Sequence, residues 1–563
     1  MPLAAPFLPV ATLLLGAALI PLANRAIGSR AVQAVGVSVS GIALLLTGVL
    51  YLAHPSVWTG QLWRPEALFG VDLGYYADSL SVSLVLLLLF ITLAVLVADL
   101  PGVSVGSKRS ESMGMLFLTL AAASSLILAA DLVTLCLSWG LLDLALFVLA
   151  ARSDSGHGRS GTPMRLLLIN YLAGVALLGG LLVLQTRGEA FSFQAAPMPA
   201  LVISLLMLAA LMRLRLYPAF LAQSPISRGV LLARVLWHIL PVAVGGYLLV
   251  RALGLAAMAS LPGSELGLLL ASLSIALSPF GLWFEVDLER AAPYIVLNQV
   301  GYMALAAVIG VPYSPAIIGS QVVTVGFALV ALFLGLGTWS SPMSRPYELA
   351  SRCCVWVAIA ALLGVPLTMG FVGRQLLYGS LMESRLAPLV LVGLLANSFM
   401  VPPLLKLGST GAPEQGAQDR FQLARVAALT VTALPLVLFG LLPELAGRVL
   451  GIQSPSAVWP TPVELVYSPG AISPAVLSVA TVGSLALGYL MYRYGSLMVD
   501  KAGDSLETLH AVAKIEWLYA GAGRAVDLVA TALVNVGGFF EGRRSAGWIL
   551  AFATLLGLLL LSS

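Results

Sequence analysis

The chain has 563 residues, of which 60% are hydrophobic and 10% are charged, and its mean hydropathy is +1.00. Because soluble domains carry about 25% charged residues, this composition excludes an ordinary soluble domain and indicates a protein that crosses a membrane many times. The formal net charge of +4 comes from basic residues scattered through the loops, so nucleic-acid binding is not implied.

The sequence carries no recognisable cofactor motif. Cys136, Cys353 and Cys354 lie in or beside apolar runs and have neither the spacing of metal ligands nor that of a disulfide framework. No cysteine cluster for an iron–sulfur centre and no glycine-rich phosphate-binding loop is present. We therefore expect no cofactor, no metal and no catalytic residue in this chain, and assign any redox or hydration chemistry to a partner.

Apolar runs of about 20 residues, the length that crosses a bilayer, predict about sixteen membrane-spanning helices. Only a tight turn at Asp131 separates the fourth from the fifth. The first run lacks a basic n-region and a cleavage site, so we expect a retained span rather than a signal peptide. The predicted spans lie near residues 3–23, 31–53, 79–99, 112–130, 132–151, 164–185, 199–222, 229–250, 264–283, 293–311, 315–336, 353–382, 386–405, 423–442, 473–492 and 546–562.

The seventh predicted span carries two arginines, Arg213 and Arg215, directly before Tyr217-Pro218. A cation in hydrocarbon is costly unless it meets water, a carboxylate or freed backbone carbonyls. Pro218 removes a backbone donor and leaves a carbonyl of the preceding turn without its partner. Arginine beside an interrupted helix therefore predicts an ion-handling site. The alternative is that both arginines extend from a helix end to the lipid headgroups.

Further prolines and glycines predict other interruptions. The twelfth range is too long for one straight crossing, and it contains Pro366, Gly370 and Gly373, so we predict a second broken helix there. In the eighth span, Pro241 is expected to loosen the helix just after His238.

Basic residues in the loops predict the orientation of the spans, because cytoplasmic loops carry an excess of lysine and arginine. With loops assigned alternately to the two faces, one face holds fourteen basic residues: Arg25, Arg30, Lys108, Arg109, Arg152, Arg159, Arg165, Arg228, Arg290, Arg345, Arg352, Lys406, Arg420 and Arg425. The other face holds five: Arg64, Arg187, Arg251, Arg385 and Arg448. We expect the first face to be cytoplasmic and both termini to lie outside. Since no targeting sequence is evident, a prokaryotic inner membrane is favoured.

Residues 500–545 interrupt the pattern of spans. Apolar Leu506 and Leu509 alternate there with charged Asp504 and Glu507, which is typical of an amphipathic helix lying along a membrane surface. We expect this segment to run laterally on the cytoplasmic face and residues 546–563 to anchor its far end as a final span. The alternative is a flexible linker, because several glycines fall within it.

Five motifs in chain order resemble those of a known family, the antiporter-like subunits of respiratory complex I and their relatives in Mrp-type antiporters, membrane-bound hydrogenases and bicarbonate-accumulating complexes. The first is Tyr76-Ala77-Asp78-Ser79-Leu80-Ser81, and the second is the fifth-span stretch from Asp131 to Trp139. The third runs from Arg213 to Pro218 and is followed by Ser224-Pro225-Ile226-Ser227. The others are Asn298-Gln299-Val300-Gly301-Tyr302-Met303, and Gly364-Val365-Pro366 with Gly370-Phe371-Val372-Gly373-Arg374.

The resemblance covers roughly residues 70–410, and it implies two inverted five-helix repeats, each with one broken helix. It places the first three spans in residues 1–111, the first repeat in 112–251, the second repeat in 264–405 and spans 14–15 in 406–499. The lateral segment and final span resemble those of the long distal member of the family.

At the positions that carry the family's chemistry, the chain departs from the motif. The resemblance implies a fifth-span glutamate, a seventh-span lysine, an eighth-span lysine or histidine and a twelfth-span lysine or glutamate. The corresponding residues here are Gly140, Arg213, His238 (within one residue of the family's histidine) and Arg374. Arginine keeps its proton under ordinary conditions, so it biases its neighbours as a fixed charge but does not relay protons as lysine does.

Asp143 is the natural substitute for the missing carboxylate. It lies three residues after Gly140, on roughly the same helical face, and it is the only carboxylate deep inside a predicted span. We expect it to pair with Arg213, Arg215 or Arg234. It is either a relocated gating carboxylate or a structural ion pair, and His238 is likewise either a proton-transfer group or a satisfied core residue.

These features predict a membrane subunit of a complex I-related assembly that translocates protons or Na⁺ in response to chemistry in partner subunits. Its expected partners are other membrane subunits and a soluble catalytic arm. Two alternatives are a non-conducting membrane scaffold, which the two lysine-to-arginine changes favour, and the membrane subunit of an inorganic-carbon uptake complex.

Overall fold

The computed structural model describes residues 5–26, 28–53, 55–60, 73–99, 107–153, 161–188, 192–193, 198–222, 230–255, 263–285, 287–310, 313–338, 345–409, 422–452 and 474–513, with residues 521, 524, 528 and 531. Thirteen of the helices in these ranges are long and apolar enough to cross a membrane. The chain divides into two compact units, residues 1–503 and 504–563. The membrane-spanning helices and both predicted breaks belong to the first unit.

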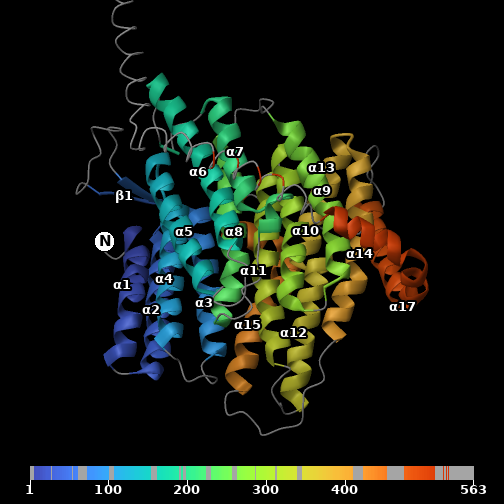
Figure 1. Ribbon diagram of the computed structural model, residues 1–563, viewed down its shortest axis with the longest axis horizontal. Helices are drawn as coiled ribbons and strands as arrows, with labels where there is room; N and C mark the ends of the chain where they lie inside the picture. The colour runs from blue at the N-terminus through green and yellow to red at the C-terminus, as the bar shows by residue number, and fades with distance from the viewer. Residues whose placement is uncertain are drawn as a thin grey trace, which may run out of the picture. The chain divides into compact units, whose positions relative to one another are not determined.

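The described elements are almost entirely helical, as predicted (Figure 1). In chain order they are α1 (Phe7–Ala26), α2 (Ser29–Ala53), β1 (Ser56–Gly60), β2 (Leu73–Ala77), α3 (Ser79–Ala98), α4 (Ser107–Ile127), α5 (Leu132–Ser153), α6 (Gly161–Arg187), α7 (Ala200–Arg213), the 3₁₀ helix η2 (Ala219–Ala222), α8 (Leu231–Leu255), α9 (Ser264–Trp283), α10 (Leu288–Ile309), α11 (Ser314–Thr338), α12 (Arg345–Leu363), α13 (Met369–Glu383), α14 (Ala387–Ser409), α15 (Gln422–Leu441), α16 (Pro443–Leu450) and α17 (Pro474–Ala513).

The first eleven predicted spans each correspond to one helix, except that the seventh is divided between α7 and η2. The twelfth is also divided, into α12 and α13. The helix α17 contains the fifteenth predicted span and continues to Ala513, into the segment predicted to be lateral. The rest of that segment, apart from four isolated positions, and the predicted final span lie outside the described residues.

A two-stranded antiparallel sheet between α2 and α3 was not predicted. Strands β1 and β2 pair in the register Ser56↔Ala77 to Gly60↔Leu73, and Trp58 of β1 stacks on Tyr75 of β2. The hairpin is too short to produce a distinct hydrophobic period. Its second strand leads directly into α3, where Asp78 and Ser81 form a reciprocal capping box that begins the helix.

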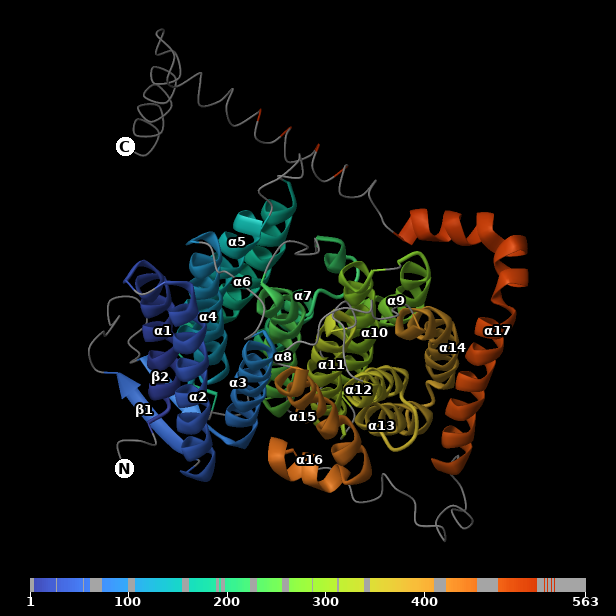
Figure 2. The same ribbon diagram turned by 90° about the horizontal axis from the view of Figure 1, so that it is seen from below.

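Helix α11 occupies the centre of the bundle. It packs against α8 and α10 on one side and against α12, α13 and α15 on the other, as the view in Figure 2 also indicates. The whole apolar window of α11 is buried. A helix that is apolar all round is stable in the bilayer or enclosed by other helices, and α11 is enclosed. Of the two interrupted spans, the halves α12 and α13 of the second pack directly against it.

Candidate functional site

The first break begins where α7 ends at Arg213. Residues 214–218 form turns rather than helix, and Arg215 has a left-handed backbone with φ of 58°. The backbone N–H of Tyr217 donates to the hydroxyl of Ser274 in α9 over 3.0 Å. Because Pro218 has no N–H to continue the helical pattern, the break is held by a neighbouring helix instead.

Asp143, halfway along α5, forms an ion pair with Arg213 at this break. Arg213 Nη1 lies 2.7 Å from Asp143 Oδ1, and both residues are buried, at 1% and 8% exposure. This separation is that of a close contact between opposite charges. The Arg213 guanidinium also lies 3.9 Å over the ring of Trp139, one turn before Asp143.

The two faces of α5 separate Asp143 from the position of the family's glutamate. Gly140 is exposed beside Leu137, Leu141 and Leu144, and a Cβ added to it would meet nothing within 4 Å. Asp143 is buried instead. The expectation that these two residues share a face was wrong, because a 60° rotation between i and i+3 suffices here to cross from the outside of the bundle to its interior.

Arg215 and His238 are buried near the same break. Arg215 is 2% exposed, and its guanidinium lies 4.8 Å from the ring centroid of Trp237 in α8. His238 is 4% exposed and stacks on Phe333 of α11 with ring centroids 6.0 Å apart. Trp237 and His238 are adjacent in α8, which packs against α7. Two of the predicted residues therefore lie at the same break as the Asp143–Arg213 pair and form one cluster of buried polar residues with it.

Arg234 lies apart from this cluster. Its guanidinium pairs with Glu289 of α10 over 2.7 Å, and both side chains are partly exposed. It is therefore not the partner of Asp143. Pro241 was predicted to loosen α8, but the helix runs unbroken from Leu231 to Leu255. A proline costs a transmembrane helix little when neighbouring helices enclose it, and α3, α7, α10 and α11 pack around α8.

The second break joins α12 to α13 through residues 364–368. Gly364 and Leu367 both have left-handed backbones, with φ of 67° and 73°, and Pro366 lies between them. Arg374, in the second turn of α13, is completely buried and donates hydrogen bonds to the carbonyls of Leu362 and Leu363. These carbonyls end α12, where the helix dipole is negative, so a fixed cation stabilises the interrupted end.

Gly370 and Gly373 lie inside α13, not in the break as predicted. A Cβ on Gly370 would lie 1.9 Å from the carbonyl oxygen of Ala361, and one on Gly373 would lie 2.0 Å from the hydroxyl oxygen of Ser320. These glycines let α13 approach α12 and α11 closely. The sequence showed two glycines but could not distinguish a flexible joint from a close helix contact.

Several polar residues of the second break were not singled out from the sequence. Arg374 also donates to the side-chain amide oxygen of Asn397 in α14, and Asn397 donates to Ser484 of α17 over 3.1 Å. Gln375, next to Arg374, donates to Thr481 of α17 over 2.9 Å. An amide in the middle of an apolar span was the available signal for Asn397. Its partner lies 23 residues away along the chain, so the pairing itself could not be read.

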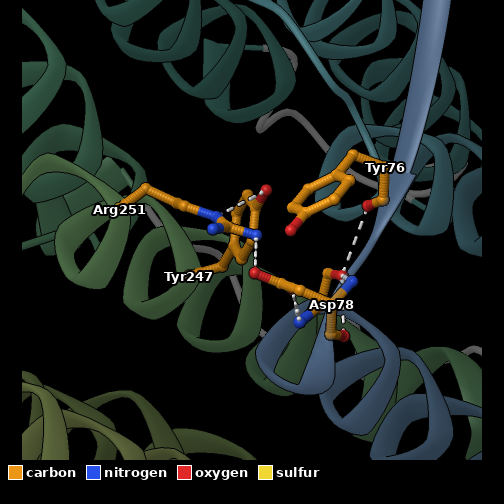
Figure 3. A network of polar contacts seen from close by, with 5 residues as sticks. Tyr76, Asp78, Tyr247 and Arg251 are labelled. Atoms are coloured by element: carbon orange, nitrogen blue, oxygen red, sulfur yellow. Dashed lines mark hydrogen bonds and ion pairs between the residues drawn. The ribbon is translucent and has the colours of Figure 1, made fainter. Parts of the chain in front are cut away.

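A second unpredicted network links α8 to the start of α3 (Figure 3). The Arg251 guanidinium lies 2.6 Å from Asp78 Oδ2, and its Nε donates to the Tyr247 hydroxyl over 3.1 Å. The same Asp78 accepts the backbone N–H of Ser81 and so begins α3. Helix α8 thus carries ion pairs near both ends, with His238 between them. Within the described ranges, no group of three or more His, Cys, Asp or Glu side chains has the arrangement of a metal site.

Comparison with known proteins decides the family. A family model described as "NADH:quinone oxidoreductase/Mrp antiporter, TM" matches residues 129–400, which contain both breaks. NADH-quinone oxidoreductase subunit N of Geobacter metallireducens is 25% identical over 477 residues, covering 77% of this chain and 98% of that protein. The chain belongs to the family of antiporter-like membrane subunits. This antiporter-like subunit is also 24% identical to NADH-quinone oxidoreductase subunit L of Mycobacterium tuberculosis, over 88% of this chain and 82% of that one.

Solved membrane complexes contain the same fold. The antiporter-like subunit matches a chain of the Mrp complex from Dietzia with a TM-score of 0.76 and 18% identity, over 99% of this chain but 63% of that one. It matches a chain of the membrane-bound sulfane sulfur reductase, an archaeal respiratory membrane complex, with a TM-score of 0.74 and 17% identity over 98% and 99% of the two chains. The family expected from the sequence motifs is confirmed. These relatives are subunits of multi-subunit membrane complexes.

Proposed function

We propose that this antiporter-like subunit still translocates ions, with protons as the first candidate and Na⁺ as the second, coupled to chemistry in partner subunits. One observation carries the proposal: Asp143 and Arg213 form a buried ion pair in the middle of the bundle, at an interrupted helix. A buried ion pair contributes little to stability compared with apolar residues of similar volume. A subunit that served only as a scaffold would gain nothing from keeping charges that leucine and methionine could replace.

The proposed route passes through Asp143 and His238. Both are buried side chains that can bind and release protons. Arg213 holds Asp143 at the first break, and a displacement of this arginine would change the proton affinity of the carboxylate. Arg374 then serves as a fixed electrostatic gate at the second break. Its bonds to Leu362 and Leu363 tie that charge to the end of α12.

Two groups along this route suit an aqueous path. His238 Nδ1 and the side-chain amide of Gln321 in α11 are fully buried and have no hydrogen-bond partner among the described residues. Buried polar groups are nearly always satisfied by protein or by ordered water. Water between the helices would satisfy these atoms and could carry protons between the two breaks.

For the assembly, we propose a complex I-related complex with a soluble catalytic arm in a prokaryotic inner membrane. The excess of basic residues in alternate loops supports cytoplasmic placement of those loops and external termini. Residues 112–251 and 264–405 are proposed as the two repeats, because each contains one interrupted helix. Inorganic-carbon uptake is the remaining alternative for the coupled process.

The test uses the intact complex, purified in mild detergent and reconstituted in sealed vesicles, with internal pH followed by a dye. We expect Asp143→Asn and His238→Ala each to lower proton flux about tenfold or more, because each removes a proton-transfer group. The matched control is Glu111→Gln, which removes an exposed carboxylate that pairs with Arg152 over 2.9 Å on α5. Its flux should stay at the wild-type level.

Two results separate the alternatives. Proton flux that is equal in wild type, Asp143→Asn and His238→Ala would contradict the proposed route. Wild-type vesicles with neither proton flux nor uptake of radioactive sodium, from a complex whose catalytic arm is active, would establish the scaffold instead. Sodium uptake that depends on Asp143 would support the proposed site and would identify Na⁺, rather than the proton, as the translocated ion.

A further inference from the structure

Five hydrogen-bond donor atoms at the first break have no acceptor among the described residues. Arg215 Nε and Nη1, Arg213 Nε and Nη2, and the indole Nε1 of Trp237 are fully buried, and none has a hydrogen-bond partner among the described residues. Each of these groups can only donate. The acidic side chain near them among the described residues, Asp143, already forms its ion pair with Arg213. These five donor atoms therefore have no acceptor among the described residues.

The charges at the break do not balance either. Arg213 and Arg215 bring two positive charges and Asp143 brings one negative charge, which leaves one positive charge uncompensated. Within the candidate membrane spans of the described residues, Asp143 is the only carboxylate away from a span end. The neighbouring sequence from 223 to 229, Gln-Ser-Pro-Ile-Ser-Arg-Gly, contains no Asp or Glu. Because a guanidinium does not lose its proton in proteins, the remaining charge needs a counter-ion.

The second break shows what a satisfied buried arginine looks like in the same molecule. Arg374 donates to the carbonyls of Leu362 and Leu363 and to the amide oxygen of Asn397. Arg215 is as deeply buried, at 2% against 0% exposure, but the described residue that its guanidinium contacts is Trp237, through the face of the ring. Arg215 also has a left-handed backbone, which is unfavourable for a residue with a side chain.

We propose that the first break binds one small monovalent inorganic anion, of the size of chloride or bicarbonate, held by the Arg215 guanidinium and the indole N–H of Trp237. The anion accepts hydrogen bonds from the unpaired donors. It also neutralises the one positive charge that Asp143 does not compensate. A water molecule would accept the same hydrogen bonds but would not supply the missing negative charge. This inference rests on the burial and charge of the break, and it holds whether or not the subunit translocates protons.

Equilibrium dialysis of the purified complex against radioactive chloride tests the proposal, with gluconate replacing chloride to keep ionic strength constant. We expect saturable binding of one chloride per chain. Arg215→Gln should weaken it about a hundredfold and Trp237→Phe, which keeps the ring and removes the N–H, about tenfold, as expected for a charged and a neutral hydrogen bond. The control Arg152→Gln removes an exposed arginine and should bind as wild type does.

Competition by bicarbonate distinguishes the two anions, because the preferred one displaces the other at lower concentration.

Thermal unfolding keeps the test decisive if a variant folds poorly. Chloride should raise the melting temperature of wild type relative to gluconate, since a ligand that binds the folded state stabilises it. Arg215→Gln should show no such rise, and in gluconate it should melt at least as high as wild type because an uncompensated charge has been removed. No saturable chloride or bicarbonate binding by wild type would overturn the proposal and leave water as the acceptor. Undiminished binding by folded Arg215→Gln would overturn it equally.

Discussion

Arginine, rather than lysine, defines the interior of this protein, and its three buried examples have different surroundings. Arg213 faces a carboxylate, Arg374 faces carbonyl oxygens, and Arg215 faces an aromatic ring. Arginine remains charged in all three settings. The sequence indicated that these residues lie at helix breaks. It gave Arg213, Arg215 and Arg234 as alternative partners of Asp143 without choosing among them, and it did not reveal that Arg374 contacts Asn397, because these residues belong to different helices.

At the residue scale, Arg374→Met is expected to destabilise the protein by about 3 kcal/mol or more, since it removes the charged donor of the buried Leu363 carbonyl and Asn397 amide oxygen. The Leu362 carbonyl keeps Gln299 as a donor over 2.9 Å. The control Arg152→Met removes an exposed ion pair with Glu111 and should cost about 0–1 kcal/mol. Thermal unfolding of the detergent-solubilised complex measures both changes. Equal melting temperatures for the two variants would contradict the assigned role of Arg374.

At the scale of elements, proline alone did not determine where the helices break. Pro218 and Pro366 lie in interrupted stretches, whereas Pro241 lies within the continuous helix α8. The difference lies in tertiary packing, which the local sequence does not contain. The breaks at 214–218 and 364–368 also include left-handed residues, Arg215 and Leu367, which only the folded chain reveals.

The close contact between α13 and α12 gives an element-scale prediction. Gly370→Ala would place a Cβ 1.9 Å from the backbone carbonyl of Ala361, so it should cost about 1–3 kcal/mol or more through overpacking. Gly379→Ala, in the same helix with nothing within 4 Å of the added Cβ, should instead stabilise by about 0.5–1 kcal/mol. Melting temperatures measured side by side test this. The idea of close packing fails if the two substitutions shift the melting temperature in the same direction.

At the scale of the whole molecule, the positions of the spans could be predicted because the bilayer fixes the length of an apolar helix. Contacts between distant parts of the chain could not. The pairs Asp78–Arg251 and Arg234–Glu289, and the contacts from Asn397 to Ser484, join helices that are separated by many residues. Hydrophobic periodicity records which residues face inward but not which of them meet. The candidate site could therefore be predicted only in part. The sequence identified its charged residues but not the hydrogen bonds of Asn397 and Gln375 around them.

The central claim is that the charge pair at the first break serves ion movement rather than folding. The most direct measurement is proton flux through reconstituted vesicles for the double variant Asp143→Asn/Arg213→Gln. Removing one member of a buried pair costs about 3–5 kcal/mol, whereas removing both is far less costly, so the double variant should melt closer to wild type than Asp143→Asn does. We predict that it assembles with its partner subunits and loses proton flux about tenfold or more. A double variant that assembles and conducts at the wild-type rate would contradict this account.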